Sequence, residues 1–269
     1  NTNKLKLLQL PFYSNIRDTI KKFKKNSFQK ENHYEKLENE DFSINYKKSF
    51  EDLMDYYQKI FELITFFHFN SSISKTVFEN NLIKPMTSHK ILAISNSSIL
   101  GGTKHINLDM AKVKKITYIG QYAEFKGFTD FINLAKKLTD KDILFEIYGE
   151  NIDVPLPSNV INKKRFSFQE KKNVFENTQL LIIPSRWKET FGFLGLEALD
   201  NNCPIFVNEN IGMKDIISEN FIFENSNLND FIQEIIHLSY NKRMDLRLPT
   251  FSEHTLQILD IYKNLYNNT

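Results

Sequence analysis

The sequence predicts an α/β protein, with one complete, doubly wound Rossmann-like domain that follows a smaller, mostly helical lobe. From about residue 112 onward, short apolar runs alternate with longer segments in which apolar residues recur at helical spacing. This alternation is typical of βαβ units whose parallel sheet is buried on both faces. The length of 269 residues fits one large domain or two small ones.

Composition narrows the class of protein further. Hydrophobic residues make up 41% and charged residues 25% of the chain, which excludes a disordered chain and a collagen-like repeat. The longest apolar runs, such as Leu180–Pro184, are far shorter than the ~20 residues of a membrane-spanning helix. The single cysteine, Cys203, excludes an internal disulfide and a cysteine-based metal cluster. It favours a reducing compartment, and we therefore expect a cytoplasmic protein.

Charge does not indicate a nucleic-acid-binding protein. Residues 1–108 hold 16 Lys and Arg against 11 Asp and Glu, a balance of +5. Residues 109–269 hold 19 against 22, a balance of −3. Neither part is strongly basic, so the sequence lacks the excess of positive charge that is typical of nucleic-acid-binding proteins.

Residues 1–108 are expected to form the smaller lobe. Apolar side chains recur at helical spacing in two of its stretches, and a polar stretch between them predicts a loop. The Gly101–Gly102 pair predicts a further loop before the second domain. The expected elements are a helix over 16–23, a loop over 31–48, a helix over 50–64, a short helix over 73–78 and a strand over 90–94.

The Lys21–Lys25 run has two interpretations. It lies beside Ile16, Ile20 and Phe23, so this helix could rest on an anionic membrane surface. The same pattern also fits the solvated face of a short helix. Peripheral contact with the inner face of a membrane is therefore an open alternative.

Residues 109–269 are expected to form the complete domain. Its final helix carries Leu256, Leu259 and Tyr262 on one face. The expected strands cover 116–119, 145–148, 180–184 and 204–207, and the expected helices cover 129–138, the region of 174–175, 192–199 and 255–266, with further alternation over 215–238.

Ligands of open parallel sheets bind beyond the carboxyl ends of the strands, so the loops there are the first candidates for a site. The first such loop runs from Gly120 to Gly127 and carries Lys126. Its glycines would let backbone N–H groups approach an anion, and Lys126 could act as a phosphate clamp. An ordinary loop with a solvated lysine explains the same residues.

The second candidate loop follows the apolar strand that ends at Pro184. It holds Glu189 just before Gly192, and the next predicted helix carries Glu197. Two carboxylates, one at the entrance of a helix and one about a turn and a half inside it, can face one cavity and accept hydrogen bonds from vicinal hydroxyls. The alternative is a glutamate that complements the helix dipole together with an unrelated surface glutamate.

The stretch from Ile116 to Ile217 resembles the donor-binding half of retaining glycosyltransferases of the GT-B fold, of the family-4 type. That family shows a strand with G-R-x-x-x-x-K-G, a strand ending in glycine, P-S-x-x-E-x-F-G-x-x-x-x-E-A, and G-x-P-V. This chain reads IGQYAEFKGF, FEIYGE and IPSRWKETFGFLGLEALDNNCPIFV in the same order, and its closing TFSEHTLQILDIYKNLY resembles the family's last helix. The resemblance implies a GT-B-like fold.

The resemblance also implies roles for particular residues. Glu197 would hold the ribose hydroxyls of a nucleotide sugar, Glu189 would lie at the hydroxyls of the transferred sugar, and Lys126 would neutralise the diphosphate. No metal and no cofactor are implied, because cationic side chains and a helix N-terminus take over the charge stabilisation. The other donor-binding residues that the resemblance implies are Gly120, Gln121, Gly192, Phe193, Leu194, Arg186, Arg165 and Phe166, with the last two near the base.

Two departures from the family's pattern matter. Gln121 stands where the family usually has arginine, and one lost electrostatic contact of this kind can lower a rate by ~10²–10³. Residues 1–108 are shorter than the family's acceptor domain and lack its first strand and glycine-rich loop, although residues 66–99 resemble its end. We therefore expect a truncated acceptor-side lobe. The context of His68 does not fit the family's sugar-site histidine.

The expected function is that of a retaining, metal-independent hexosyltransferase. It would move a hexose from a UDP- or GDP-linked sugar to a glycan, lipid-linked or protein acceptor, with bacterial surface polysaccharide synthesis as the expected role. The first alternative is a non-catalytic or truncated glycosyltransferase-like subunit that partners an active one. The second is a nucleotide-sugar epimerase on the same fold.

Overall fold

The computed structural model describes residues 42–82, 86, 88–152, 155–224, 232 and 240–267. The chain divides into two compact units, Asn1–Ile64 and Thr65–Thr269. The domain boundary predicted near residue 108 falls inside the second unit. Strand β3 (Gly102–Asp109) crosses that position and pairs along its whole length with β10 (Asn241–Leu248). Assignment of residues 1–108 to an acceptor-side lobe stays a prediction.

The described part of the first unit is helix α3 (Phe42–Phe61). The loop predicted over 31–48 is wrong for residues 42–48, which are helical. The aromatic spacing begins earlier than predicted, with Phe42 and Tyr46 ahead of Phe50, and the lysines among these residues are good helix formers. The helix predicted over 16–23, with its lysine run, lies outside the described residues.

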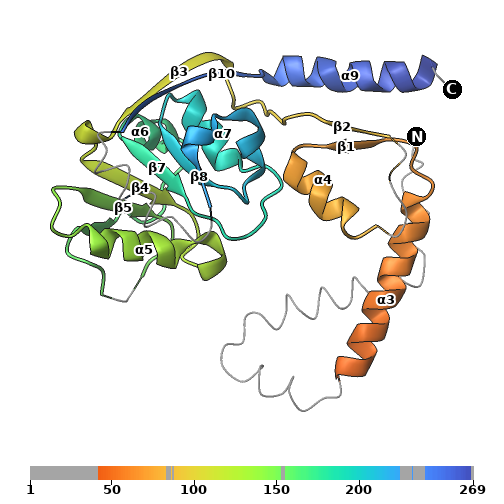
Figure 1. The fold of residues 1–269 in the computed structure, drawn as a ribbon, viewed down its shortest axis with the longest axis horizontal. Coiled ribbons are helices and arrows are strands. Elements are labelled where there is room, and N and C mark those ends of the chain that lie inside the picture. Colours follow the sequence, from red (N-terminus) through yellow and green to blue (C-terminus); the bar gives the residue numbers. More distant parts are fainter. Residues whose placement is uncertain are drawn as a thin grey trace. The chain divides into compact units, whose positions relative to one another are not determined.

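The second unit contains a six-stranded parallel sheet of order β6-β5-β4-β7-β8-β9 (Figure 1). The order reverses between β4 and β7, so successive crossovers step in opposite directions and cover both faces. Figure 1 shows α5 on one side of the sheet and α6 and α7 on the other. The bounds are β4 Lys115–Ile119, β5 Leu144–Tyr148, β6 Val160–Asn162, β7 Leu180–Ile183, β8 Ile205–Asn208, β9 Ile222–Phe223, α5 Phe128–Lys137, α6 Lys171–Glu176 and α7 Phe193–Asp200. The predicted doubly wound α/β domain is confirmed.

The core of this unit lies on both faces of the sheet. All four residues of β7 and all four of β8 are buried, which explains their unbroken apolar sequence. On the α5 side, the ring of Phe131 packs 5.4 Å from Tyr118 and 5.5 Å from Phe145, measured between centroids. This packing fixes α5 against β4 and β5.

Sequence reasoning missed β3 and β10, which form a two-stranded antiparallel ribbon. Gly102, predicted as loop, is the first residue of β3. Both strands bury alternate side chains, Ile106 and Leu108 in β3 and Met244 and Leu248 in β10, and expose polar or charged residues between them. A ribbon with one solvated face has no continuous apolar run but alternates apolar and polar residues, as at Met244, Leu246 and Leu248. A search for continuous runs passes over this signal.

A small βαβ arrangement consists of the parallel strands β1 (Phe67–Phe69) and β2 (His89–Ile91) and helix α4 (Ser72–Glu79), which lies between them in the sequence. The short helix predicted here is confirmed. Its start is fixed by a capping box, in which the Ser71 side chain accepts from the Ser74 N–H and the Ser74 side chain accepts from the Ser71 N–H. The predicted strand over 90–94 ends earlier, at Ile91.

Helix α9 (Phe251–Asn267) confirms the predicted final helix, but the predicted face is not the buried one. Leu256, Leu259 and Tyr262 are exposed. The buried residues are His254 and Ile261, which lie seven residues apart and therefore share one face of the helix. Four shorter 3-10 helices complete the described elements: η2 Met110–Lys112, η3 Glu124–Lys126, η4 Gly212–Ile216 and η5 Glu219–Phe221.

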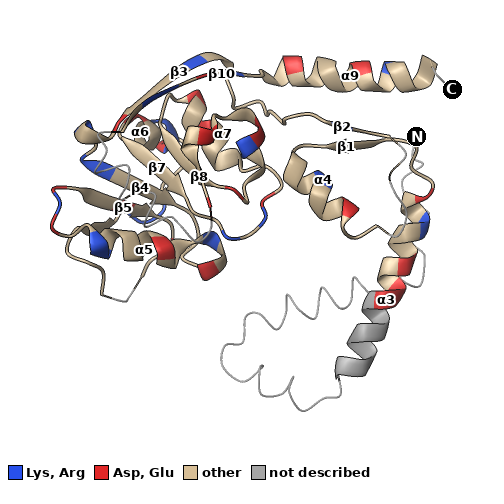
Figure 2. Ribbon diagram, viewed as in Figure 1, with Lys and Arg blue, Asp and Glu red and all other residues tan. Residues whose placement is uncertain are grey.

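Figure 2 shows acidic and basic residues interspersed over the second unit. Across the described part of the chain, we find no helix with both the length and the apolar character needed to span a membrane.

Candidate functional site

The candidate site lies where the strand order of the sheet reverses. Strands β4 and β7 are neighbours and parallel, so the loops that follow them leave the same edge of the sheet. These are the Gly120–Gly127 loop and the Pro184–Gly192 loop of the sequence analysis. The backbone N–H groups of Arg186 and Trp187 both donate to the Phe125 carbonyl at 3.0 Å. The two predicted loops are therefore in direct contact.

Gly127 is required for this contact. Its φ is +72°, and a Cβ at this position would collide with the Pro184 carbonyl. A side chain is disfavoured by both the backbone conformation and the lack of space. Only glycine lets α5 begin this close to the end of β7.

Lys126 and Glu189 meet across the two loops. The Lys126 Nζ donates to Glu189 Oε1 at 2.7 Å. Their side chains are 31% and 20% exposed, so the pair lies at the surface of the edge and is reachable by a ligand. The structure thus brings together two of the three groups on which the predicted site depends.

Glu189 is held by the segment that follows β8. Its N–H donates to the Asn210 carbonyl at 2.9 Å, and its own carbonyl accepts from the Gly212 N–H at 3.1 Å. A Cβ added to Gly192, the N-cap of α7, would lie 3.9 Å from Glu189 Oε2. The carboxylate therefore sits close to the N-terminus of α7, whose partial positive charge favours an anion.

Glu197 lies on α7, four residues after its first residue, Phe193, or roughly 6 Å along the helix axis. Its Oε1 accepts from the Lys171 Nζ on α6 at 2.9 Å, and the two side chains are 22% and 19% exposed. Sequence reasoning missed Lys171, because nothing in its local pattern points to a carboxylate 26 residues further on. Glu197 and Glu189 each carry a lysine partner.

Gly120 and Gln121 close the end of β4. The Gly120 N–H donates to the Tyr148 carbonyl at 3.0 Å. The Tyr118 hydroxyl donates to the Gln121 carbonyl at 2.5 Å, and burial, followed by the nearby Tyr122 and Glu189, raises the pKa of the Tyr118 phenol. The side chain of Gln121 itself is exposed. The backbone of this turn is thus fixed by a buried neutral phenol.

Arg186 is engaged away from Lys126. Its guanidinium donates to both carboxylate oxygens of Asp130, at 2.8 and 2.6 Å, and to Glu124 at 3.0 Å. The hydrogen bond to Asp130 is the main reason that the pKa of Arg186 is raised. A diphosphate contact by Arg186 would have to compete with two carboxylates.

The residues predicted near the base follow β6. Arg165 pairs with Glu150 at 3.3 Å, and both side chains are largely exposed. The ring of Phe166 stands edge-on to Tyr148, with centroids 5.6 Å apart. Tyr148 ends β5, so Phe166 lies beside the carboxyl end of the sheet.

Phe193 and Leu194 form the first turn of α7, as predicted. Phe193 is exposed and contacts Phe191 edge-on, with centroids 6.1 Å apart. Cys203 is buried, and burial raises the pKa of its thiol to about 12, as suits a packing residue. Among the residues that the structure describes, no group of three or more His, Cys, Asp or Glu side chains is arranged to hold a metal ion.

This arrangement defines a class of protein: a Rossmann-like domain with paired acidic and basic groups at the switch point of its sheet. The chain matches the family described as "Glycosyl transferases group 1" over residues 104–249, more than half of its length. The protein belongs to this glycosyltransferase family. No curated protein matches the chain in a sequence search.

Solved structures share the fold at low sequence identity. TarM matches with a TM-score of 0.53 and 21% identity, over 69% of this chain and 38% of its own. Sucrose-phosphate synthase from Thermosynechococcus elongatus matches with a TM-score of 0.54 and 12% identity, over 81% of this chain and 63% of its own. A glycosyltransferase from Rickettsia africae matches with a TM-score of 0.54 and 12% identity, over 81% of this chain and 68% of its own. The chain has the Rossmann-like fold of GT-B glycosyltransferases and spans less than two thirds of the first two relatives.

Proposed function

We propose that the protein is a retaining, metal-independent hexosyltransferase that uses a nucleotide diphosphate sugar as donor. The observation that carries the proposal is the meeting of Lys126 and Glu189 at 2.7 Å, from the two loops at the switch point of the sheet. This is where open α/β sheets bind nucleotides. Membership of the glycosyltransferase family supports the same reading.

Lys126 and Glu189 have complementary tasks in this proposal. The Lys126 ammonium stabilises the diphosphate as it leaves with the electron pair of the bond to the anomeric carbon. The Glu189 carboxylate accepts hydrogen bonds from the hydroxyls of the sugar and fixes its orientation. The acceptor oxygen bonds to the anomeric carbon on the same face, and its proton passes to the departing phosphate oxygen. The protein contributes charge stabilisation and orientation, without covalent chemistry of its own.

Glu197 is assigned to the nucleoside. Glu197 lies about one turn inside α7, and in this proposal its carboxylate accepts hydrogen bonds from the ribose hydroxyls of a nucleotide whose diphosphate is held at the helix entrance. The Lys171 ammonium lies 2.9 Å from this carboxylate and orients it. In this proposal Phe166, beside Tyr148 at the sheet edge, contacts a uracil or guanine base together with the neighbouring Arg165.

The wider role that we propose is transfer to a glycan, lipid-linked or protein acceptor in bacterial surface polysaccharide synthesis. A cytoplasmic location, at or near the inner face of the membrane, would suit such a reaction. The single buried cysteine is in keeping with a reducing compartment. Together with membership of the family, this supports the proposed setting.

A second candidate is a non-catalytic subunit that partners an active glycosyltransferase. Gln121 replaces the arginine that the resemblance implies, and the Arg186 guanidinium is bound to Asp130 and Glu124. Of the cations on these two loops, Lys126 and Lys188 would then remain for the diphosphate. A weakened donor site is the expected trait of a subunit that keeps the fold but leaves catalysis to its partner.

Ligand-observed NMR with UDP and GDP tests the proposal. We expect saturation-transfer signals from one of the two nucleotides, and a Kd about tenfold higher in Glu197→Gln, because a charge-assisted hydrogen bond to ribose is lost. Glu219→Gln, on the exposed surface of η5, is the matched control and should bind as the unmodified chain does. Release of hexose from the matching nucleotide sugar should accompany binding. If neither nucleotide binds, the partner-subunit alternative is favoured.

A further inference from the structure

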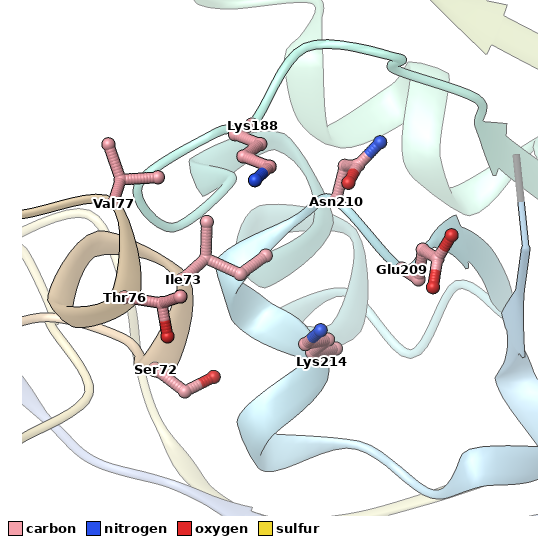
Figure 3. A pocket seen from close by; sticks show the side chains of 8 residues that line it. All are labelled: Ser72, Ile73, Thr76, Val77, Lys188, Glu209, Asn210 and Lys214. Atoms are coloured by element: carbon pink, nitrogen blue, oxygen red, sulfur yellow. The ribbon is translucent and has the colours of Figure 1, made fainter. Parts of the chain in front are cut away.

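A pocket of about 210 Å³ lies between α4 and the segments that follow β7 and β8 (Figure 3). Helix α4 lines one side with Ile73 and Val77. In Figure 3 the side chains of Lys188 and Lys214 enter the pocket from opposite sides. The volume is below the ~300 Å³ of the smallest pockets for drug-sized ligands, so it suits a group of the size of one sugar.

The walls of the pocket are held together by hydrogen bonds. The N–H and the hydroxyl of Ser72 each donate to the Asp215 carboxylate at 2.5 Å. The neighbouring Ser71, which is fully buried, donates to the Thr190 carbonyl. These bonds tie the start of α4 to η4 and to the loop after β7. The pocket is therefore preformed.

The pocket shares backbone with the Glu189 segment. Lys188 directly precedes Glu189, and Asn210, another lining residue, accepts a hydrogen bond from the Glu189 N–H at 2.9 Å. The Glu189 side chain is not part of the pocket lining. A ligand in the pocket would therefore lie next to the proposed sugar site without occupying it.

The charges of the lining favour an anionic ligand. The lining holds two lysines and one carboxylate, that of Glu209, while the Asp215 carboxylate behind it is engaged by the N–H and hydroxyl of Ser72. Within the described part of the chain, the ammonium groups of Lys188 and Lys214 have no ion-pair or hydrogen-bond partner. A phosphate or carboxylate between them would gain charge-assisted hydrogen bonds. The Thr76 hydroxyl adds a group that pairs with sugar hydroxyls.

We propose that this pocket binds the acceptor, and that the acceptor is a sugar that carries a phosphate or carboxylate group. This proposal rests on the function proposed above and adds the substrate class on the acceptor side. The anionic group lies between Lys188 and Lys214. The apolar face of the sugar ring packs on Ile73 and Val77, and a free hydroxyl of the sugar points toward the Glu189 segment, where it attacks the donor.

Saturation-transfer NMR of the full chain with glucose 6-phosphate, glucose and inorganic phosphate tests the proposal. We expect glucose 6-phosphate to bind at least about tenfold more tightly than glucose, because only the phosphate reaches the lysines. Lys214→Gln should raise the Kd for glucose 6-phosphate at least about tenfold, while Lys214→Arg keeps the charge and retains binding. Lys188→Gln gives a second, independent variant.

The controls separate this pocket from the donor loops. Lys137→Gln, on the exposed side of α5, should leave binding of glucose 6-phosphate unchanged, and Lys214→Gln should leave the Kd for UDP and GDP unchanged. The proposal is overturned if both pocket variants bind glucose 6-phosphate normally, or if saturating nucleotide displaces it. Normal nucleotide binding without glucose 6-phosphate binding overturns this proposal alone. The reverse result overturns the donor function and leaves the anion pocket supported.

Discussion

At the scale of single residues, the Lys126–Glu189 ion pair contributes little to stability, and we propose that it serves ligand binding. Both side chains are partly exposed, and ion pairs of this kind typically contribute only about 0.2–1 kcal/mol to the free energy of unfolding. The same holds for Lys171 and Glu197, which are exposed to a similar degree. Two such ion pairs beside the switch point of the sheet therefore add little to the free energy of unfolding.

Substitution of Lys126 separates these two roles. We expect Lys126→Gln to lower kcat/KM for sugar transfer by ~10²–10³, because one cation at the departing diphosphate is lost. The free energy of unfolding should change by less than about 1 kcal/mol. Steady-state kinetics and urea denaturation measure the two quantities, with Lys137→Gln as the control. A variant that is destabilised in step with its loss of activity would contradict the assignment.

At the scale of elements, the site depends on how closely the ends of β4 and β7 approach each other. Gly127 starts α5 with φ +72° and lies against the Pro184 carbonyl. Gly102, at the start of β3, has a similar φ of +86°, but a Cβ there would meet nothing within 4 Å. A substitution at Gly102 therefore tests backbone strain alone, whereas a substitution at Gly127 tests backbone strain together with lack of space.

We expect Gly127→Ala to be clearly more destabilising than Gly102→Ala. Both variants place alanine at a positive φ, which costs about 1–3 kcal/mol. Only Gly127→Ala adds a clash with backbone, which costs about 1–3 kcal/mol more. Urea denaturation at neutral pH measures the difference. Equal losses in the two variants would show that the β4 and β7 loops separate without cost, and would weaken the site geometry.

The β3–β10 ribbon is attached to the sheet domain through a buried carboxylate on α7. The buried carboxylate of Asp200, at the end of α7, accepts from the N–H groups of Leu100 and Gly101 at 2.8 and 3.0 Å. It also lies 2.9 Å from the Lys104 ammonium. A buried carboxylate with three donors is well satisfied. This contact explains why residues 102–109 belong to the same compact unit as α7.

At the scale of the whole molecule, burial of acidic groups in neutral form makes stability depend on pH. Burial raises the pKa of the Cys203 thiol to about 12 and those of the Tyr122 and Tyr148 phenols to about 12. In the unfolded chain these groups ionise near ~8.5 and ~10. Above those values the unfolded chain holds fewer protons than the folded one, so stability falls as pH rises through about 9 to 12.

We therefore expect a lower free energy of unfolding at pH 10.5 than at pH 8. A single buried thiol accounts for up to about 1.4 kcal/mol for each pH unit above its unfolded pKa. Urea denaturation at both values measures the change, and Cys203→Ala should show a smaller fall. Native protein at pH 8 should also leave a thiol reagent unreacted until it unfolds. The same stability at both values, or a reactive native thiol, would contradict the buried position of Cys203.

The sequence by itself determined four strands of the parallel sheet and the helices that cover it, but not the short strand β6 or the position of the switch point. Runs such as Leu180–Ile183 are apolar throughout because both faces of the sheet are covered, and that property is local. The sequence also marked Lys126 and Glu189, because the end of a strand and the start of a helix are readable from neighbouring residues. The order of these elements along the chain then places both residues at one edge.

Only the tertiary structure decided which groups meet. Arg186 binds Asp130 and Glu124 rather than standing free, Glu197 takes Lys171 as its partner, and β3 pairs with β10 far along the chain. Each of these interactions joins residues that are distant in the sequence, and no periodic pattern predicts which residues will pair. The physical reason is that the burial of a helix or strand leaves a pattern of apolar residues within that one segment. The partner of a polar group depends instead on which distant segments the packing brings together.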